Sequence, residues 1–558
     1  MLQWTMYIIG RLLLPRPVRR KLINYITGIR LKQIGSEHWQ NGQLAKAAAA
    51  LGTAAQIDQL GDYEEALLTV CTLGSGDQAG ALDLLRGFFA SDNGWDALSE
   101  FGGIPLMREE DYFFSGTSAE NIQEIIDAGL LVIGYYLTAA WLHNVGRGNE
   151  TAVLASKAHA FQALIRPHTR PGPEAKAFLL QNRISLEELN VFPPSWVNQI
   201  GHIGMLEIML RMRQMGWWQG KAVVLARKRE LANAVFLEVV TRQPDVYVVF
   251  EESEPALFAD FRKLVITHGR PYDPFQPPQY PWIRWHDTGA LALWKKREAG
   301  DESCIGVRDS FDRMVACEGA DLEQKFNAAM REWGIASTGW YVCLHFRRSQ
   351  ANYGQANRNA GFDNYRSAID YVVGRGGKVV LMGAKDEGKL PDIPGLINYP
   401  VSQYKSDLFD LMLIRRARLL IGTTSGLANV AISLGIPTAQ VNCITTEYQP
   451  WNSRVRFCLK SVTRSDGTRY SQRDLSENSR YLLATSESMA AAGLVAQDNT
   501  AEEILATVQE VDMMIDGQFA GDDEILERWQ RCLAQPYAYG GAWPAAGFLR
   551  LQREEFFS

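Results

Sequence analysis

The stretch from Gly339 to Cys443 constrains the fold more than any other part of the chain, because strand-like apolar runs alternate there with helix patterns. Trp340 to Leu344 is a continuous apolar run of the kind that forms a parallel strand buried on both faces. Further strand runs follow at Lys378 to Met382, Arg418 to Ile421 and Thr438 to Cys443, with helix patterns between them. This alternation predicts an α/β fold built on a parallel sheet.

Polar residues follow two of these strand runs at the point where each ends. His345, Arg347 and Arg348 come directly after the first run, and the loop Gly422 to Gly426 follows the third and opens another helix. Ligands bind at the carboxyl ends of parallel strands, and the free N–H groups and positive dipole of a helix N-terminus attract phosphate. The sequence therefore predicts a diphosphate-binding site at this edge of the sheet.

The residues assigned to that site supply guanidinium, hydroxyl and backbone N–H donors, and glycine permits close approach. They are Arg347, Arg348, Thr423, Thr424, Ser425 and Gly426, with Glu447 on the polar loop after Cys443. The plain alternatives are arginines that only form salt bridges within the sheet and an ordinary strand-to-helix turn.

A second α/β pattern begins near Val191 and has the same order of strand, glycine turn and helix. We expect a strand at Trp196 to Ile200, a tight turn at Gly201 to Gly204, a helix from Met205 and a strand at Lys221 to Ala226. Together the two patterns predict two Rossmann-like domains that face each other across a cleft.

Composition excludes some partners and sets a compartment. The chain has 558 residues, 46% of them hydrophobic and 22% charged, with a net charge of -6, and it carries no nucleic-acid signature. Its seven cysteines are scattered without a Cys-x-x-Cys spacing, which fits a reducing cytoplasm.

The beginning of the chain departs from this average. Residues 1–30 combine an apolar start that is interrupted by Arg11 and Pro15 with a run of basic residues, and no acidic residue precedes Glu37. This pattern favours an amphipathic helix on an anionic membrane surface, and the alternative is a helix packed on its own protein.

The region that follows, up to about residue 170, has a helical pattern. Its turn Leu60 to Leu67 resembles the turn inside a tetratricopeptide repeat, so we expect a degenerate helical-hairpin region that docks a partner or serves as a spacer. The predicted domains are a basic membrane-associating helix at 1–35, a helical domain at 36–170, Rossmann-like domains at 171–335 and 336–500, and C-terminal helices at 501–558.

Several short motifs resemble those of bacterial glycosyltransferases that accompany surface-polysaccharide genes. They are Gly201-His202, Val342-Cys343-Leu344-His345-x-Arg347, Arg358-Asn359 with Asn364-Tyr365, and Gly422-Thr423-x-Ser425-Gly426. The resemblance implies a GT-B fold and transfer of a sugar from a nucleotide-sugar donor to a glycan, lipid-linked or protein acceptor. It also implies a place on the inner face of the bacterial cytoplasmic membrane.

The His-x-Arg-Arg run is also similar to that of GT-B fucosyltransferases, in which an arginine engages the nucleotide diphosphate. Ser349-Gln350 replaces the threonine and aspartate usual there, so a GDP-fucose donor is not implied.

The base that deprotonates the acceptor should come from the first α/β half, across the cleft from the donor. We assign the catalytic roles to His202 and Glu207, with His345 as a further candidate and Asp363 in reserve. Arginine and helix-dipole charge can replace a metal at the leaving group, and the sequence has no Asp-x-Asp triplet, so we predict a metal-independent enzyme without a cofactor. The alternatives are a nucleotide-sugar 2-epimerase of the same fold and a non-catalytic helical-repeat scaffold.

Overall fold

The computed structural model forms two compact units. One contains residues 1–179 and 259–279, and the other contains residues 180–258 and 280–558. The structure describes residues 16–40, 43–57, 60, 62–89, 127–132, 134–135, 138–139, 148–214, 218–269, 307–318, 320–348, 353–385, 390–444, 452–475, 486–533 and 542–557.

The first unit is helical in the part of the chain that the structure describes. Its helices are α2 (Arg16–Gln40), α3 (Leu44–Ile57), α4 (Asp62–Gly74), α5 (Gln78–Phe89), α8 (Gly148–Ile165), α9 (Pro173–Gln181) and α12 (Pro255–His268), the last two crossing the unit's limits. Consecutive helices from α2 to α5 pack on one another around a core that includes Leu51, Leu67 and Leu85. The segment Leu60 to Leu67, expected as a turn, lies mostly within α4, which begins at Asp62, and the tetratricopeptide interpretation stays a prediction.

A three-stranded parallel sheet opens the second unit. Its strands are β1 (Leu189–Phe192), β2 (Lys221–Ala226) and β3 (Val246–Phe250), in the order β1-β2-β3. The helix α10 (Ile200–Gln214) follows β1, and α11 (Ala234–Thr241) follows β2. Each helix therefore begins near the carboxyl edge of this sheet.

Two local predictions in this region are wrong. Trp196 to Ile200 is not a strand, because Pro193 and Pro194 have no N–H to donate to a ladder, and the strand ends before them at Phe192. The segment Gly201 to Gly204 is not a turn but belongs to the first turns of α10.

The larger sheet of the second unit has seven strands, all parallel. They are β4 (Tyr341–His345), β5 (Lys378–Leu381), β6 (Leu396–Asn398), β7 (Leu420–Gly422), β8 (Thr438–Cys443), β9 (Val455–Leu459) and β12 (Trp543–Pro544). Read from β6, the order is β6-β5-β4-β7-β8-β9-β12. This is the doubly wound order of dinucleotide-binding folds, and it reverses between β4 and β7.

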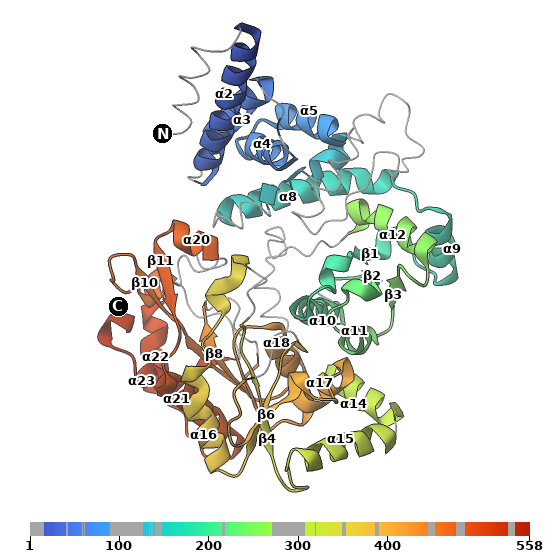
Figure 1. The fold of residues 1–558 in the computed structure, drawn as a ribbon. Coiled ribbons are helices and arrows are strands. Elements are labelled where there is room, and N and C mark those ends of the chain that lie inside the picture. Colours follow the sequence, from blue (N-terminus) through green and yellow to red (C-terminus); the bar gives the residue numbers. More distant parts are fainter. Residues whose placement is uncertain are drawn as a thin grey trace. The chain divides into compact units, whose positions relative to one another are not determined.

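Helices cover both faces of this sheet. Figure 1 shows α16 (Arg366–Gly374) and α21 (Ala501–Ile515) on one side, and α17 (Asp407–Arg416) and α18 (Gly426–Ser433) on the other. The remaining elements are α14 (Val307–Glu318), α15 (Ala320–Glu332), β10 (Ser461–Arg464), α20 (Ser486–Ala491), β11 (Leu494–Gln497), α22 (Asp523–Cys532) and α23 (Ala546–Arg550). The apolar runs of the sequence are buried here, with Val342, Leu344 and Ile421 in the core of the sheet.

The two sheets of the second unit meet through the N-terminal ends of their helices. The backbone of α10 touches that of α18 at Gly201 and Gly426. The first residue of α17, Asp407, accepts a hydrogen bond of 2.8 Å from the backbone N–H of Ala234, the first residue of α11. Helix N-termini lie at the carboxyl edge of a parallel sheet, so the carboxyl edges of the two sheets face each other. The predicted fold class, α/β with two Rossmann-like parts after a helical domain, is confirmed.

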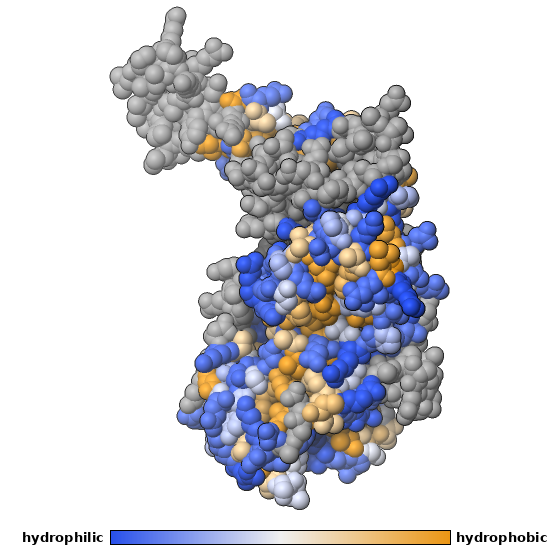
Figure 2. All heavy atoms as spheres, turned by 90° about the vertical axis from the view of Figure 1, so that its right-hand side faces the viewer, coloured by the Kyte–Doolittle hydropathy of each residue, from blue (hydrophilic) through white to orange (hydrophobic). Residues whose placement is uncertain are grey.

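The surface shows the mixture of side chains that the composition predicts. On the face in Figure 2, hydrophilic residues surround smaller groups of hydrophobic ones. Within the described ranges, no helix has both the length and the apolar character needed to cross a membrane. Met1 to Leu14, the apolar part of the predicted membrane-binding helix, lies outside the described residues.

Candidate functional site

The strand order places the two predicted ligand-binding segments next to each other. β4 and β7 are neighbours, with His345 opposite Gly422. The backbone N–H of Thr423 donates to the carbonyl oxygen of His345 at 3.1 Å. Since the order of the sheet reverses between these two strands, both segments lie where doubly wound folds bind their ligands.

His345 is built into this edge as a structural group. Its side chain is 7% exposed, and Nδ1 lies 3.0 Å from the Ser425 hydroxyl oxygen. Burial lowers the pKa of His345 to about 3, and the positive charges of Arg347, Arg348 and Lys405 contribute. The ring is therefore neutral near pH 7 and ties the end of β4 to the start of α18.

The loop before α18 presents three hydroxyl groups in different states. Ser425 is the N-cap of α18, and its hydroxyl oxygen accepts from the N–H of Ala428 at 3.3 Å. The Thr424 hydroxyl oxygen accepts a 3.0 Å bond from Nε2 of Gln440. The Thr423 hydroxyl is buried and has no hydrogen-bond partner within the described residues.

Gly426 has a role that the sequence did not reveal. A Cβ atom there would lie 2.1 Å from Cγ2 of Ile200 and 2.6 Å from the backbone nitrogen of Gly201. The glycine is thus required for close approach of α18 to α10, whereas the sequence suggested close approach to a phosphate. As a consequence, two positive helix ends meet at this point.

His202 lies beside this contact, in the first turn of α10. Its Nδ1 is 2.7 Å from the carbonyl oxygen of Ser195, which fixes the proton on Nδ1 because a carbonyl can only accept. Nε2 is then the basic nitrogen of the neutral ring. Burial lowers the pKa of His202; the bond to Ser195 raises it, and the nearby charge of Arg358 lowers it further.

Glu207 lies five residues further along α10 in a different environment. Its side chain is 3% exposed and forms an ion pair with Arg211, one helical turn away. A base must reach the acceptor hydroxyl, and this carboxylate would first have to leave its partner. The structure therefore shows Glu207 as the buried ion-pair partner of Arg211.

The two arginines after β4 are both half-buried. The guanidinium carbon of Arg348 lies 5.2 Å from the centre of the Phe346 ring. The carbonyl oxygen of Arg347 accepts a 3.0 Å hydrogen bond from the N–H of Ala360. The charges of both arginines act on His345, which places them at the carboxyl end of β4.

The remaining sequence candidates do not extend the site. Asp363 is exposed at the start of a short 3-10 helix, and Glu447 lies outside the described residues. Among the described residues, no group of three His, Cys, Asp or Glu side chains has the arrangement of a metal site.

One cation near the site escaped the sequence analysis. Lys405 forms an ion pair with Asp410, with 2.6 Å between Nζ and Oδ1, and its charge acts on His345. It directly precedes Ser406, the N-cap of α17, so the rule that ligand groups follow strand ends would have found it had β6 been recognised.

Comparisons with known proteins give limited information. No family model matches the chain, and no curated protein matches it. A family 9 glycosyl transferase structure from Veillonella parvula covers 49% of this chain and 85% of its own, with 12% identity and a TM-score of 0.32. The E. coli ADP-heptose lipopolysaccharide heptosyltransferase II covers 55% and 98%, with 15% identity and a TM-score of 0.30.

A third solved structure, E. coli heptosyltransferase WaaC with ADP, covers 49% of this chain and 92% of its own, with 9% identity and a TM-score of 0.31. At these TM-scores the likeness is too weak to assign a fold or a function. The fold and the proposed function therefore rest on the strand order and the contacts of this chain.

Proposed function

We propose that this protein is a glycosyltransferase of the GT-B type, which moves a sugar from a nucleotide-sugar donor to a glycan, lipid-linked or protein acceptor. One observation carries the proposal. The reversal point of a doubly wound sheet, with its arginines, faces the helix N-termini of a second parallel sheet that presents a neutral histidine.

The donor diphosphate binds at the carboxyl ends of β4 and β7. Arg347 and Arg348 supply charge-assisted hydrogen bonds, and the N-terminus of α18 supplies backbone N–H groups and the positive end of its dipole. Departure of the nucleotide develops negative charge on the diphosphate, which these groups stabilise without a metal ion or a cofactor.

The acceptor binds on the side of the three-stranded sheet, where His202 acts as the base. Support comes from the Ser195 carbonyl, which fixes the proton on Nδ1 and makes Nε2 the nitrogen that would take a proton from the acceptor hydroxyl. The lowered pKa of His202 keeps the ring in its neutral, proton-accepting form near pH 7.

The helical part of the chain before the α/β halves is suited to an acceptor that lies at the membrane surface. Residues 1–30 would hold the enzyme on the anionic cytoplasmic face of the membrane, and the helical domain at 36–170 would dock the acceptor or its carrier. From the sequence patterns we also propose the domain limits 1–35, 36–170, 171–335, 336–500 and 501–558.

The test is incubation of the full chain with a panel of nucleotide sugars, with and without an extract of bacterial glycans and lipid-linked sugars. Free nucleotide and sugar identity are followed by chromatography. Nucleotide release that depends on the extract supports transfer. Interconversion of the sugar without release would indicate an epimerase, and no binding of any nucleotide in a thermal-shift assay would reject a donor site.

A further inference from the structure

A short segment that follows β4 in the chain returns to Arg347 and is held by hydrogen bonds at several backbone points. Its residues 357–361 include the end of a 3-10 helix (Tyr353–Arg358) that follows β4. The hydrogen bonds are Asn357 N–H to the Ser486 hydroxyl at 2.9 Å, Lys460 Nζ to the Asn359 carbonyl at 2.6 Å, Ala360 N–H to the Arg347 carbonyl at 3.0 Å, and Gly361 N–H to Asp498 Oδ2 at 2.7 Å. Arg358 is thus flanked by fixed backbone on both sides.

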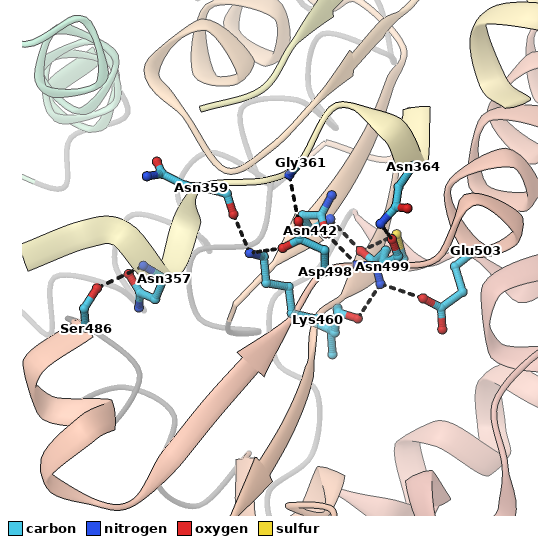
Figure 3. Close-up of polar contacts among 12 residues, drawn as sticks. Asn357, Asn359, Gly361, Asn364, Asn442, Lys460, Ser486, Asp498, Asn499 and Glu503 are labelled. Carbon is cyan, nitrogen blue, oxygen red and sulfur yellow. Dashed lines mark hydrogen bonds and ion pairs between the residues drawn. The ribbon is translucent and has the colours of Figure 1, made fainter. Parts of the chain in front are cut away.

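A buried lysine is central to this arrangement. Lys460 directly follows β9, and its side chain is 3% exposed. Its Nζ lies 2.7 Å from Oδ1 of Asp498 and bonds the carbonyl of Asn359, as Figure 3 shows. Burial of a charge is costly unless a partner compensates it. Asp498 is that partner, and the other oxygen of its carboxylate holds Gly361.

The position of Asp498 is itself fixed by the next residue. Asn499 and Asn442 bond each other reciprocally, each side-chain oxygen accepting from the other residue's backbone N–H at 2.6 and 2.7 Å. The Asn499 side chain also donates to the Leu459 carbonyl at 2.8 Å (Figure 3). The ends of β8 and β9 and the start of α21 therefore form one rigid frame beneath residues 357–361.

From this frame we infer that Arg358 is a further residue that binds the donor diphosphate, and that Lys460 and Asp498 are positioning residues that hold it there. The inference rests on the proposed function. It extends the donor site beyond the two arginines that directly follow β4, and it uses a group that comes from a different segment of the same half.

Two observations place Arg358 at the site. Its backbone lies beside that of Arg347, because Ala360, two residues later, bonds the Arg347 carbonyl. Its charge also acts on His202, which adjoins the contact between Gly201 and Gly426 at the N-terminus of α18. The guanidinium therefore lies within electrostatic range of the point where the two positive helix ends meet.

The experiment measures binding of inorganic pyrophosphate and of nucleoside diphosphates to the full chain by calorimetry. Loss of a hydrogen bond to a charged group corresponds to roughly a tenfold or greater change in Kd, so R358A should bind pyrophosphate about tenfold more weakly. R366A, which removes an exposed arginine eight residues along the chain, is the matched control and should bind like the wild type.

Non-additivity separates positioning from general stability. K460M should weaken binding by several-fold, and the double variant R358A/K460M should bind no more weakly than R358A, because Lys460 acts through Arg358. D498N is the second variant, in case K460M does not fold, and it should show the same non-additivity. Additive losses would overturn the positioning roles.

The outcomes distinguish the two proposals. If R347A loses pyrophosphate binding while R358A binds like the wild type, the role of Arg358 is rejected and the proposed donor site stands. If the wild-type chain binds neither pyrophosphate nor any nucleoside diphosphate, the proposed function fails and the inference fails with it.

Discussion

The carboxyl edges of the two sheets present opposite chemistry, and their histidines show it most clearly. His345, on the larger sheet, is buried, bonded to Ser425 and surrounded by cations, so its pKa falls to about 3. His202, in the first turn of α10 beside the smaller sheet, is half-buried and bonded to a backbone carbonyl, and its pKa is lowered mainly by burial. The first edge is suited to hold an anion, and the second is suited to accept a proton.

The role of a histidine therefore follows from its hydrogen-bond partners more than from its position at the edge of a sheet. Both histidines lie near helix N-termini, and the sequence had marked both as catalytic candidates. A backbone carbonyl fixes the proton of His202 on Nδ1, whereas Nδ1 of His345 contacts a hydroxyl group, which can donate or accept.

Replacement of His202 should have the largest effect on turnover. H202Q removes the proposed base, and loss of a general base costs about 100-fold to 10,000-fold in kcat. Donor affinity should be unchanged, because the proposed donor site lies at the other edge. Turnover is measured as acceptor-dependent nucleotide release, with H38Q in α2 as the control. A normal kcat for H202Q would remove the histidine from catalysis.

Loss of both arginines should act on affinity. R347A/R348A removes two charge-assisted contacts, so nucleoside diphosphates should bind roughly 100-fold more weakly. Circular dichroism checks that the fold persists, and calorimetry gives Kd. Unchanged affinity, with R366A as the matched control, would show that the diphosphate binds elsewhere.

A larger residue at Gly426, where α18 contacts α10, should push the two helices apart. In G426A the added methyl group meets Ile200 and the backbone of Gly201 at less than 3 Å, so α18 must shift away from α10. Overpacking of this kind costs about 2 kcal/mol of stability. We expect a lower denaturation midpoint and weaker donor binding. The equivalent change at Gly52, which meets no atom within 4 Å, is the control, and an equal effect of G52A would contradict this account.

The smallest effect concerns pH and stability. The pKa of His345 is 6.5 when unfolded and about 3 when folded, so in acid the unfolded chain binds a proton that the folded chain does not. The free energy of unfolding is therefore not reduced by this group well above pH 6.5. It should fall by about 1 kcal/mol between pH 6.5 and 5.5.

Chemical denaturation at these two pH values measures the change. The variant H345Q should lose this part of the pH dependence, and H202Q should retain it. An equal pH dependence in the wild type and in H345Q would contradict the buried, neutral state of His345.

Sequence reasoning located the larger sheet well because its strands are continuous apolar runs with clear ends. Lys221–Ala226 and Thr438–Cys443 are strands with the predicted bounds. The short strand β6 and the strand β9, which carries an arginine, have no such pattern and were missed. The two prolines after Phe192 indicate that the first strand ends before them, on the N-terminal side of the predicted Trp196 to Ile200.

The candidate site was predictable only where its residues directly follow a recognisable strand. His345, Arg347 and the loop before α18 follow strands, and the reversal of strand order brings them together. The bond from Lys460 to Asn359 joins residues that are far apart in the chain, and no local pattern marks it. The role of Gly426 depends on a helix from the other half, which the sequence could not place.

The proposed donor site lies at the carboxyl ends of β4 and β7. Backbone hydrogen exchange of the full chain, measured with and without a saturating nucleoside diphosphate, shows where the diphosphate binds. We expect slower exchange at residues 345–348, 357–361 and 423–428, with little change at β3 or α15. Protection confined to other segments, or no protection with a nucleotide that calorimetry shows to be bound, would contradict it.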